Sequence, residues 1–172
     1  MRRLLLLRHA KASPDGKAGD DHVRELTARG RANAAVLGAF LHKSGLAPGL
    51  VLCSTAKRTV ETWNIVAAEM GASPRAEFLD QLYLAPAKKI QTILRNALGA
   101  ASVLVVGHNP GIEDCAAGLA RKPANKEEAA RLQRLKDKFP TCALAVLAFD
   151  AAHWADTGAG AFEAFVRPKD LE

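Results

Sequence analysis

The sequence predicts an α/β fold, a three-layer α/β/α sandwich around a mostly parallel central sheet. Short apolar runs bounded by turn residues alternate along the chain with longer stretches of helical period, which is typical of this class. A length of 172 residues with 49% hydrophobic residues allows one sizeable core but not two. We therefore expect a single domain over residues 1–172.

Six segments are expected to form strands because they are rich in aliphatic residues and lie between turn signals. The last of them follows a turn-rich segment and is expected to pair at an edge of the sheet. The stretch Ser13–Asp21, rich in Gly, Asp and Lys, is expected to be a flexible loop after the first strand. The six strand segments are Arg3–Leu7, Leu50–Cys53, Arg75–Leu79, Ser102–Val106, Cys142–Phe149 and Gly160–Val166.

Five segments with apolar residues at helical spacing are expected to form helices. The first two end near Gly45 and Gly71, and the next two begin with a proline, which suits a first helical turn. The fifth is dense in charge, with Ala129, Leu132 and Leu135 as its only apolar stripe, so we expect it on the surface. The five segments are Thr27–Lys43, Ala56–Met70, Pro86–Leu98, Pro110–Ala120 and Asn125–Lys138.

The composition limits the environment and the partners. Neither a signal peptide nor an apolar run of membrane-spanning length is present in the sequence, so we expect a cytoplasmic protein with no membrane partner. A formal charge of +6 favours an anionic partner, whereas 5% aromatic residues argue against a nucleic-acid surface. Cys53, Cys115 and Cys142 lack the spacing of a metal site and are expected to be buried thiols.

Charged side chains follow three of the predicted strands at the points where these strands end. Arg8 and His9 follow the first strand, Arg58 lies near the start of the helix after the second, and His108 follows the fourth. In open α/β sheets, ligands bind at the carboxyl ends of the strands. We therefore expect these four side chains to converge on one pocket.

Two arginines and two histidines suit a phosphoryl ligand. Guanidinium groups grip phosphoryl oxygens through paired hydrogen bonds, and helix starts after Ser54 and Asn109 add backbone N–H groups. A neutral imidazole is a competent nucleophile toward phosphorus. Such a site needs no metal and no cofactor, because arginine and histidine already neutralise the transferring group.

At these residues the sequence resembles the histidine phosphatase (phosphoglycerate mutase-like) superfamily and its short SixA-type branch of phosphohistidine phosphatases. The signature at the end of the first strand reads Arg8-His9-Ala10, with alanine where the family usually has glycine. The resemblance covers nearly the whole chain. The further matching segments are Val23-Arg24-Glu25-Leu26-Thr27-Ala28-Arg29-Gly30, Ser54 to Thr62, Gly107-His108-Asn109-Pro110 and Phe139-Pro140-Thr141.

The resemblance implies a metal-independent phosphatase that works through a phosphorylated His9. It also implies that Arg8, Arg58 and His108 complete the catalytic phosphate pocket and that Arg24 is a further phosphate contact. Lys11 and Lys57 flank these residues and are interpreted as steering charges at most.

The substrate depends on a general acid that the sequence does not place. Larger family members protonate a leaving alkoxide with a carboxylic acid from the segment that corresponds here to Glu77–Tyr83, and the sequence does not decide whether Glu77, Asp80 or neither is that acid. The leaving imidazole of a phosphoramidate needs that acid less. A phosphohistidine protein is therefore the favoured substrate and partner. A phosphatase of sugar phosphates or nucleotides and a non-catalytic phosphoprotein-binding module remain the alternatives.

The other histidines, His22, His42 and His153, show no convergent partners in the sequence pattern. We expect them to face solvent or to cap helices. The sequence predicts no oligomeric state.

Overall fold

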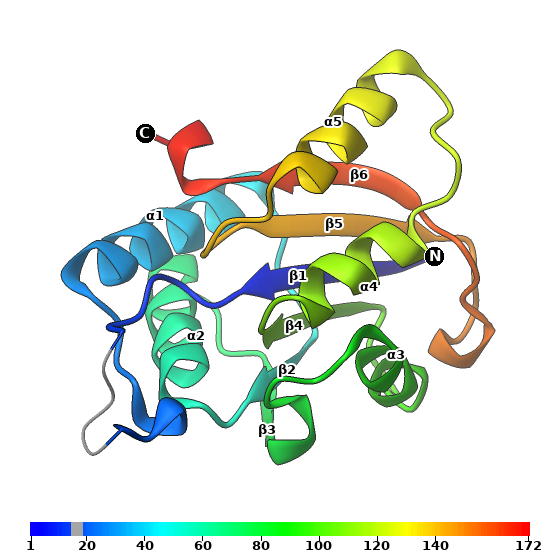
Figure 1. Ribbon diagram of the computed structural model, residues 1–172. Coiled ribbons are helices and arrows are strands. Elements are labelled where there is room, and N and C mark those ends of the chain that lie inside the picture. The colour runs from blue at the N-terminus through cyan, green and yellow to red at the C-terminus, as the bar shows by residue number, and fades with distance from the viewer. Residues whose placement is uncertain (15–18) are drawn as a thin grey trace.

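The chain forms a six-stranded sheet with helices on both faces (Figure 1). This computed structural model describes residues 1–14 and 19–172. The strands are β1 (Arg2–Arg8), β2 (Leu50–Ser54), β3 (Arg75–Leu79), β4 (Ser102–Gly107), β5 (Leu144–Phe149) and β6 (Ala161–Val166). Their order in the sheet is β3-β2-β4-β1-β5-β6. The neighbouring strands from β3 through β2 and β4 to β1 all pair in parallel, and β5 runs antiparallel to both of its neighbours.

The helices cover both faces of the sheet and complete the expected three layers. Two of them pack on one face, and the other three pack on the opposite face (Figure 1). The first two are α1 (Ala28–Ser44) and α2 (Lys57–Met70). The other three are α3 (Ala87–Arg95), α4 (Gly111–Leu119) and α5 (Lys126–Asp137). Short 3-10 turns add η2 (Asp21–Val23), η3 (Asp80–Leu82), η4 (Trp154–Asp156) and η5 (Pro168–Asp170).

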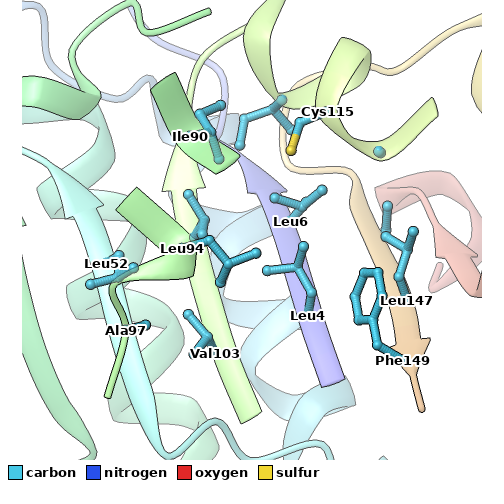
Figure 2. Close-up of a cluster of buried hydrophobic side chains, with 14 of the residues drawn as sticks. Leu4, Leu6, Leu52, Ile90, Leu94, Ala97, Val103, Cys115, Leu147 and Phe149 are labelled. Carbon is cyan, nitrogen blue, oxygen red and sulfur yellow. The ribbon is translucent and has the colours of Figure 1, made fainter. Parts of the chain in front are cut away.

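Strand β1 is buried on both faces, which explains why its apolar residues do not alternate with polar ones. Leu4 and Leu6 point into the core beneath α3, α4 and α5 (Figure 2). Leu5 and Leu7 point into the opposite core beneath α1 and α2. All four leucines are fully buried, so this strand is fixed from both sides at the centre of the sheet.

The parallel register brings three strand ends to one edge of the sheet. In the pairing of β1 with β4, Arg8 lies opposite Gly107, and in the pairing of β2 with β4, Cys53 lies opposite Val106. The antiparallel strand β5 starts at this same edge. The segments after β1, β2 and β4 and the segment before β5 therefore meet there.

Most of the predicted elements are confirmed, with their ends shifted by a few residues. The edge position of β6 and the left-handed glycines that end α1 and α2, Gly45 and Gly71, are also as expected. Pro86 and Pro110 precede their helices as caps and do not occupy the first turn. The three cysteines are free and buried. Of the predicted loop Ser13–Asp21, residues 15–18 lie outside the described residues, and Asp21 begins η2.

The apolar stripe predicted for α5 is wrong at one position. Leu132 and Leu135 are buried, but Ala129 is exposed and Glu128 is buried in its place. The Glu128 carboxylate accepts hydrogen bonds from the backbone N–H groups of Ala124 and Phe162 at 2.8 and 2.9 Å. It thereby fixes α5 to β6, and these bonds offset the cost of burying a charge.

None of the described helices combines the length and the apolar character that a membrane span requires.

The start of α1 packs tightly on the segment that leaves β1. The Lys11 carbonyl accepts from the backbone N–H of Thr27 at 2.9 Å and from its hydroxyl at 3.2 Å. A Cβ on Gly30 would lie 2.1 Å from that same carbonyl oxygen. Glycine at this position therefore permits the contact, which holds the chain just after His9.

We predict that Gly30→Ala lowers the free energy of unfolding by about 1–3 kcal/mol, because the added methyl group forces backbone apart. Urea unfolding would measure the change. Gly118→Ala in α4 is the matched control, since nothing lies within 4 Å of its Cβ position. There the higher helix propensity of alanine should add about 0.5–1 kcal/mol of stability. Equal effects of the two substitutions would contradict this account of the α1 contact.

Candidate active site

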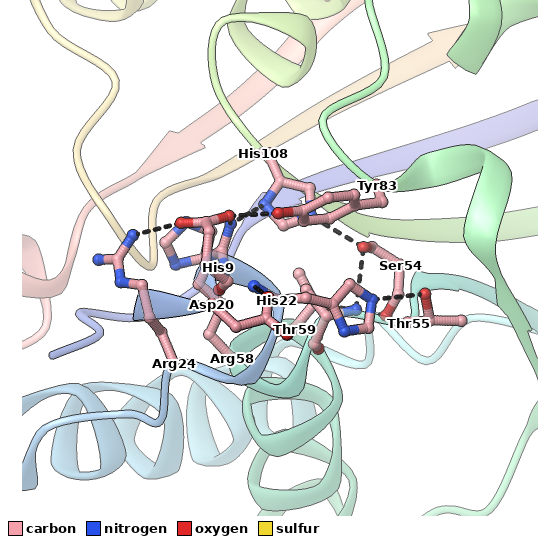
Figure 3. Close-up of polar contacts among 12 residues, drawn as sticks. His9, Asp20, His22, Arg24, Ser54, Thr55, Arg58, Thr59, Tyr83 and His108 are labelled. Atoms are coloured by element: carbon pink, nitrogen blue, oxygen red, sulfur yellow. Dashed lines mark hydrogen bonds and ion pairs between the residues drawn. The ribbon is translucent and has the colours of Figure 1, made fainter. Parts of the chain in front are cut away.

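A pocket of about 570 Å³ lies at the carboxyl edge of the parallel strands. All five residues predicted for the site line it, and they come from four segments of the chain. Figure 3 shows four of them, His9, Arg24, Arg58 and His108. These residues are Arg8, His9, Arg24, Arg58 and His108. The structure thus brings the four side chains expected to converge into one hollow together with Arg24, and their roles in catalysis and phosphate binding stay predictions.

His9 is fixed in place by its backbone and by its ring. Its N–H donates to the Gly107 carbonyl at 3.0 Å, and its carbonyl accepts from the N–H of Cys142 at 3.0 Å. The ring atom Nδ1 lies 2.7 Å from the Ala10 carbonyl oxygen. A carbonyl oxygen can only accept, so Nδ1 carries the proton in this contact. The other nitrogen, Nε2, then holds the lone pair and is available as a nucleophile.

His108 lies beside His9, with 5.4 Å between the ring centroids. Its Nε2 is 2.8 Å from the hydroxyl oxygen of Ser54, and its Nδ1 is 3.3 Å from a guanidinium nitrogen of Arg58. Because a guanidinium only donates, Nδ1 acts as the acceptor and Nε2 carries the proton. His108 is thus held as a neutral ring between a serine at the end of β2 and an arginine at the start of α2.

The three arginines reach the pocket in different ways. Arg8 donates from Nη1 to the Phe139 carbonyl at 2.9 Å. Arg24 donates from Nε to the Ser13 carbonyl at 2.6 Å. Arg58 is almost fully buried and donates from Nη1 to the Asp21 carbonyl at 2.7 Å. Each guanidinium is thus tethered to a backbone carbonyl, which orients it before any ligand arrives.

The carboxylate of Asp21 joins these cations inside the pocket. It accepts from Arg24 at 2.9 Å and from Arg58 at 3.0 Å, and the hydroxyl of Tyr83 donates to it. The hydrogen bonds from Tyr83 and Arg24 hold the pKa of Asp21 well below its usual range, with Arg58 adding to the effect. This carboxylate is therefore ionised, and it occupies an anion position between two guanidinium groups.

Both site histidines are neutral at physiological pH. Burial lowers the pKa of His9 to about 4, and the charges of Arg58, Arg8 and Arg24 add to that effect against the opposing Ala10 hydrogen bond. Burial also lowers the pKa of His108 to about 3, together with the charges of His9 and Arg58. An unprotonated imidazole within a cluster of cations is both nucleophilic and close to groups that attract anions.

Neither candidate acid from the sequence analysis lines the pocket. Glu77 lies on the edge strand β3 and pairs with Arg75 at 2.7 Å. Asp80 accepts from the hydroxyl of Thr55 at 2.6 Å and is exposed. Of the two lysines proposed as steering charges, Lys11 lines the pocket, whereas Lys57 pairs with Glu25.

Sequence reasoning missed three residues of the site, Asp21, Ser54 and Tyr83. From sequence, Asp21 is expected at the end of the loop Ser13–Asp21, and Tyr83 carries no expected role at the end of the segment Glu77–Tyr83. The expectation that His22 has no partner is also wrong, because its Nε2 lies 3.1 Å from the Thr55 hydroxyl and its ring contacts Tyr83 edge-on at 4.8 Å. The sequence does carry a signal for Asp21, because the acidic pair Asp20-Asp21 lies close to Arg24, the predicted phosphate contact. A carboxylate beside such an arginine suggests a counter-ion.

The described residues contain no group of three or more His, Cys, Asp or Glu side chains placed to hold a metal ion. The polar groups that converge here are imidazoles and guanidinium groups with one carboxylate between them. This arrangement binds an anion and presents a nucleophilic nitrogen to it.

Comparisons with known proteins agree with this geometry. Residues 4–83 match the model of the histidine phosphatase superfamily (branch 1). An uncharacterized protein of Mycobacterium tuberculosis, Rv1276c, is 39% identical over 90% of this chain and 93% of its own length. The structure of a candidate phosphohistidine phosphatase SixA from Nakamurella multipartitia is 30% identical, with a TM-score of 0.80 over 97% of this chain and 96% of that one. A candidate SixA from Agrobacterium tumefaciens is 26% identical, with a TM-score of 0.81 over 97% and 98%.

The chain therefore belongs to the histidine phosphatase superfamily, in its SixA-type branch.

The ring protons of His9 and His108 should report the low pKa values directly. In a proton NMR titration, we expect their C2–H resonances to shift near pH 4 and pH 3, respectively. The variants His9→Ala and His108→Ala assign the two resonances. A midpoint near pH 6.5 for either ring would contradict the buried, neutral state described above.

The same shift predicts how stability changes with pH. Between pH 6.5 and about 4 the unfolded chain binds a proton at position 9 and the folded chain does not, so stability falls as pH falls through that window. The slope of the free energy of unfolding against pH reports the difference in bound protons between the unfolded and folded chains, and we expect His9→Ala to lower that difference by about one proton. Denaturant unfolding at several pH values measures it, with the exposed His153→Ala as the control. An unchanged slope in His9→Ala would contradict the prediction.

Proposed function

We propose that the chain is a metal-independent phosphatase that takes a phosphoryl group from a phosphohistidine protein onto His9 and then passes it to water. One observation carries the proposal most directly. His9 presents an unprotonated Nε2 to a pocket that three guanidinium groups line. The similarity to candidate SixA phosphohistidine phosphatases from two bacteria supports the same conclusion.

In the first step, the lone pair on Nε2 of His9 attacks phosphorus. A bond forms between Nε2 and phosphorus while the bond from phosphorus to the leaving nitrogen of the substrate breaks. Arg8, Arg24 and Arg58 hold the phosphoryl oxygens in line for this transfer and stabilise the charge on them. These cations neutralise the group without a metal ion.

The leaving group decides which substrate suits the site. A departing alkoxide needs a proton from an acid, whereas the imidazole of phosphohistidine is less basic and departs with a proton already bound. Among the described residues, Asp21 is the one carboxyl group that lines the pocket, and its hydrogen bonds keep it ionised. The site therefore favours a phosphoramidate over a phosphate ester.

In the second step, water attacks the phosphorus of phosphorylated His9. The bond from phosphorus to Nε2 breaks, its electron pair returns to the ring, and one proton of the water passes to a phosphoryl oxygen as inorganic phosphate forms. In the structure, Nδ1 of His108 accepts from Arg58. A dianionic phosphoryl group draws that guanidinium to its own oxygens and raises the pKa of His108, so Nδ1 then takes up a proton and becomes a second donor in both steps. Ser54 holds the other side of that ring at 2.8 Å throughout.

The first test compares two substrates in the presence of a chelator. We expect wild type to hydrolyse a phosphohistidine-bearing protein with a kcat/KM at least about a hundredfold above that for glycerol 2-phosphate, an alkyl ester whose leaving alkoxide needs a proton. His9→Ala should lose about a thousandfold or more of this activity. Arg58→Lys should lose about tenfold to a hundredfold, because lysine cannot supply the paired hydrogen bonds of a guanidinium. His153→Ala, on the exposed far side, should behave as wild type.

Other results would favour the alternatives. Hydrolysis of the ester at an equal or higher rate would indicate a working acid and a small-molecule phosphatase. Binding of the phosphoprotein by wild type without turnover would indicate a binding module. Loss of activity in chelator, restored by a divalent metal, would contradict the metal-independent mechanism.

Asp21 provides a second test, because it occupies the anion position of the proposed phosphate site. We expect Asp21→Asn to bind inorganic phosphate about tenfold more tightly, since the resident negative charge no longer competes for Arg24 and Arg58. Isothermal titration calorimetry measures the affinity. Asp20→Asn is the matched control, because the Asp20 carboxylate accepts from the backbone N–H of His22 and does not line the pocket. Weaker phosphate binding in Asp21→Asn alone would mean that Asp21 positions the arginines and does not compete with the ligand.

A further inference from the structure

A basic groove of about 250 Å³ adjoins the pocket of His9. The two hollows share Lys11, Pro140 and Thr141 in their walls, so one leads into the other. Beyond the shared wall, the groove is lined by the first turns of α1 and by the segment that follows β6. Its cationic side chains are Lys11, Arg29, Arg167 and Lys169.

Most of the positive charge in this basic groove is uncompensated. Arg167 pairs with Asp170 at 2.9 Å. Lys11, Arg29 and Lys169 are exposed and form no ion pair with any residue that the structure describes. Within the described ranges, no carboxylate lines the groove. Three cations with overlapping fields therefore face solvent next to the pocket.

The backbone beneath these cations is held firmly. The Lys11 carbonyl accepts two hydrogen bonds from Thr27, and Gly30 packs against it without room for a Cβ. Because Arg29 lies between Thr27 and Gly30, this contact fixes its position beside Lys11. The turn η5, which carries Lys169, packs against α1 from the other side. The backbone positions that carry these cationic side chains are thus fixed relative to His9.

The lining of both hollows indicates which ligand fits. No aromatic side chain among the described residues lines the groove, and His9 and His108 supply the rings in the pocket. A nucleobase would therefore find no aromatic platform in the groove to stack on. The apolar residues that line the groove are Pro140 and Pro168, and four of its eight lining residues are Lys or Arg. Such a surface complements carboxylates spread over a protein.

We propose that the basic groove docks acidic side chains that flank the phosphohistidine on the substrate protein. This inference rests on the proposed function, and it assigns the contacts that select the substrate outside the phosphoryl pocket. Acidic residues near the phosphohistidine meet Arg29 and Lys169 as the phosphoryl group enters the site of His9. The attraction speeds encounter and lowers KM, and it leaves the chemistry at His9 unchanged.

Two synthetic peptides test the docking surface. Each carries one chemically phosphorylated histidine, flanked by four glutamates in one peptide and by four glutamines in the other. For wild type at low salt, we expect a KM about tenfold lower for the glutamate peptide, with similar kcat for the two. The difference should shrink as salt rises, because surface charges are screened.

Charge reversal assigns the effect to the groove. In Arg29→Glu/Lys169→Glu, the KM for the glutamate peptide should rise by about tenfold or more, and kinetics with the glutamine peptide should stay unchanged. The control is Lys88→Glu/Lys126→Glu, which makes the same change of charge on α3 and α5, on the other face of the sheet. This control should retain the preference of wild type for the glutamate peptide.

The outcomes separate the two proposals. If wild type hydrolyses both peptides with the same KM, or if both double variants lose the preference equally, the docking surface is wrong and the proposed function stands. If wild type hydrolyses neither peptide, the proposed function fails and the docking proposal fails with it. If groove reversal weakens inhibition by a sugar bisphosphate but leaves the peptides alone, the groove serves a small polyanion and the docking proposal is overturned.

Discussion

The site depends on the pairing of two buried parallel strands, β1 and β4. The side chains Leu4–Leu7 of β1 are buried in the cores on both faces of the sheet. The register of β1 with β4 places Arg8 opposite Gly107. The next residues along each chain segment are His9 and His108, so the two imidazoles come together as a direct result of that register. The apolar burial that stabilises the sheet therefore also fixes the position of the two imidazoles in the pocket.

Burial and positive charge act together on His9. Both lower the tendency of the ring to take up a proton, and the Ala10 carbonyl directs the proton that remains to Nδ1. The same arginines that disfavour the imidazolium would attract a phosphoryl dianion. Without that ligand, the carboxylate of Asp21 compensates their charge, which explains how Arg58 can be nearly fully buried. The contacts of Asp21 with Arg24 and Arg58 therefore show that the pocket accommodates a negatively charged group.

The features of the molecule that could be predicted from sequence follow from the periodicity of apolar residues and from the positions where strands end. The six strands, the five helices and the convergence of Arg8, His9, Arg58 and His108 are such cases, because buried strands carry a local signal and parallel strands share an edge. For Asp21 the sequence offers only the weak signal of an acidic pair, and for Tyr83 it offers none, since both lie outside the regular helices and strands and their contact depends on tertiary packing. Glu128 shows a similar limit, because its burial depends on N–H groups of Ala124 and Phe162 that pattern alone does not place.

The central claim is that Nε2 of His9 carries the phosphoryl group during turnover. The most direct measurement is a rapid alkaline quench of the enzyme with its phosphohistidine substrate, followed by mass spectrometry and phosphorus NMR of the digested chain. We expect a phosphoryl group on His9, bonded to Nε2, that forms and decays at rates consistent with turnover. A turning-over enzyme with no phosphoryl group on His9, or with one bonded to Nδ1, would contradict it.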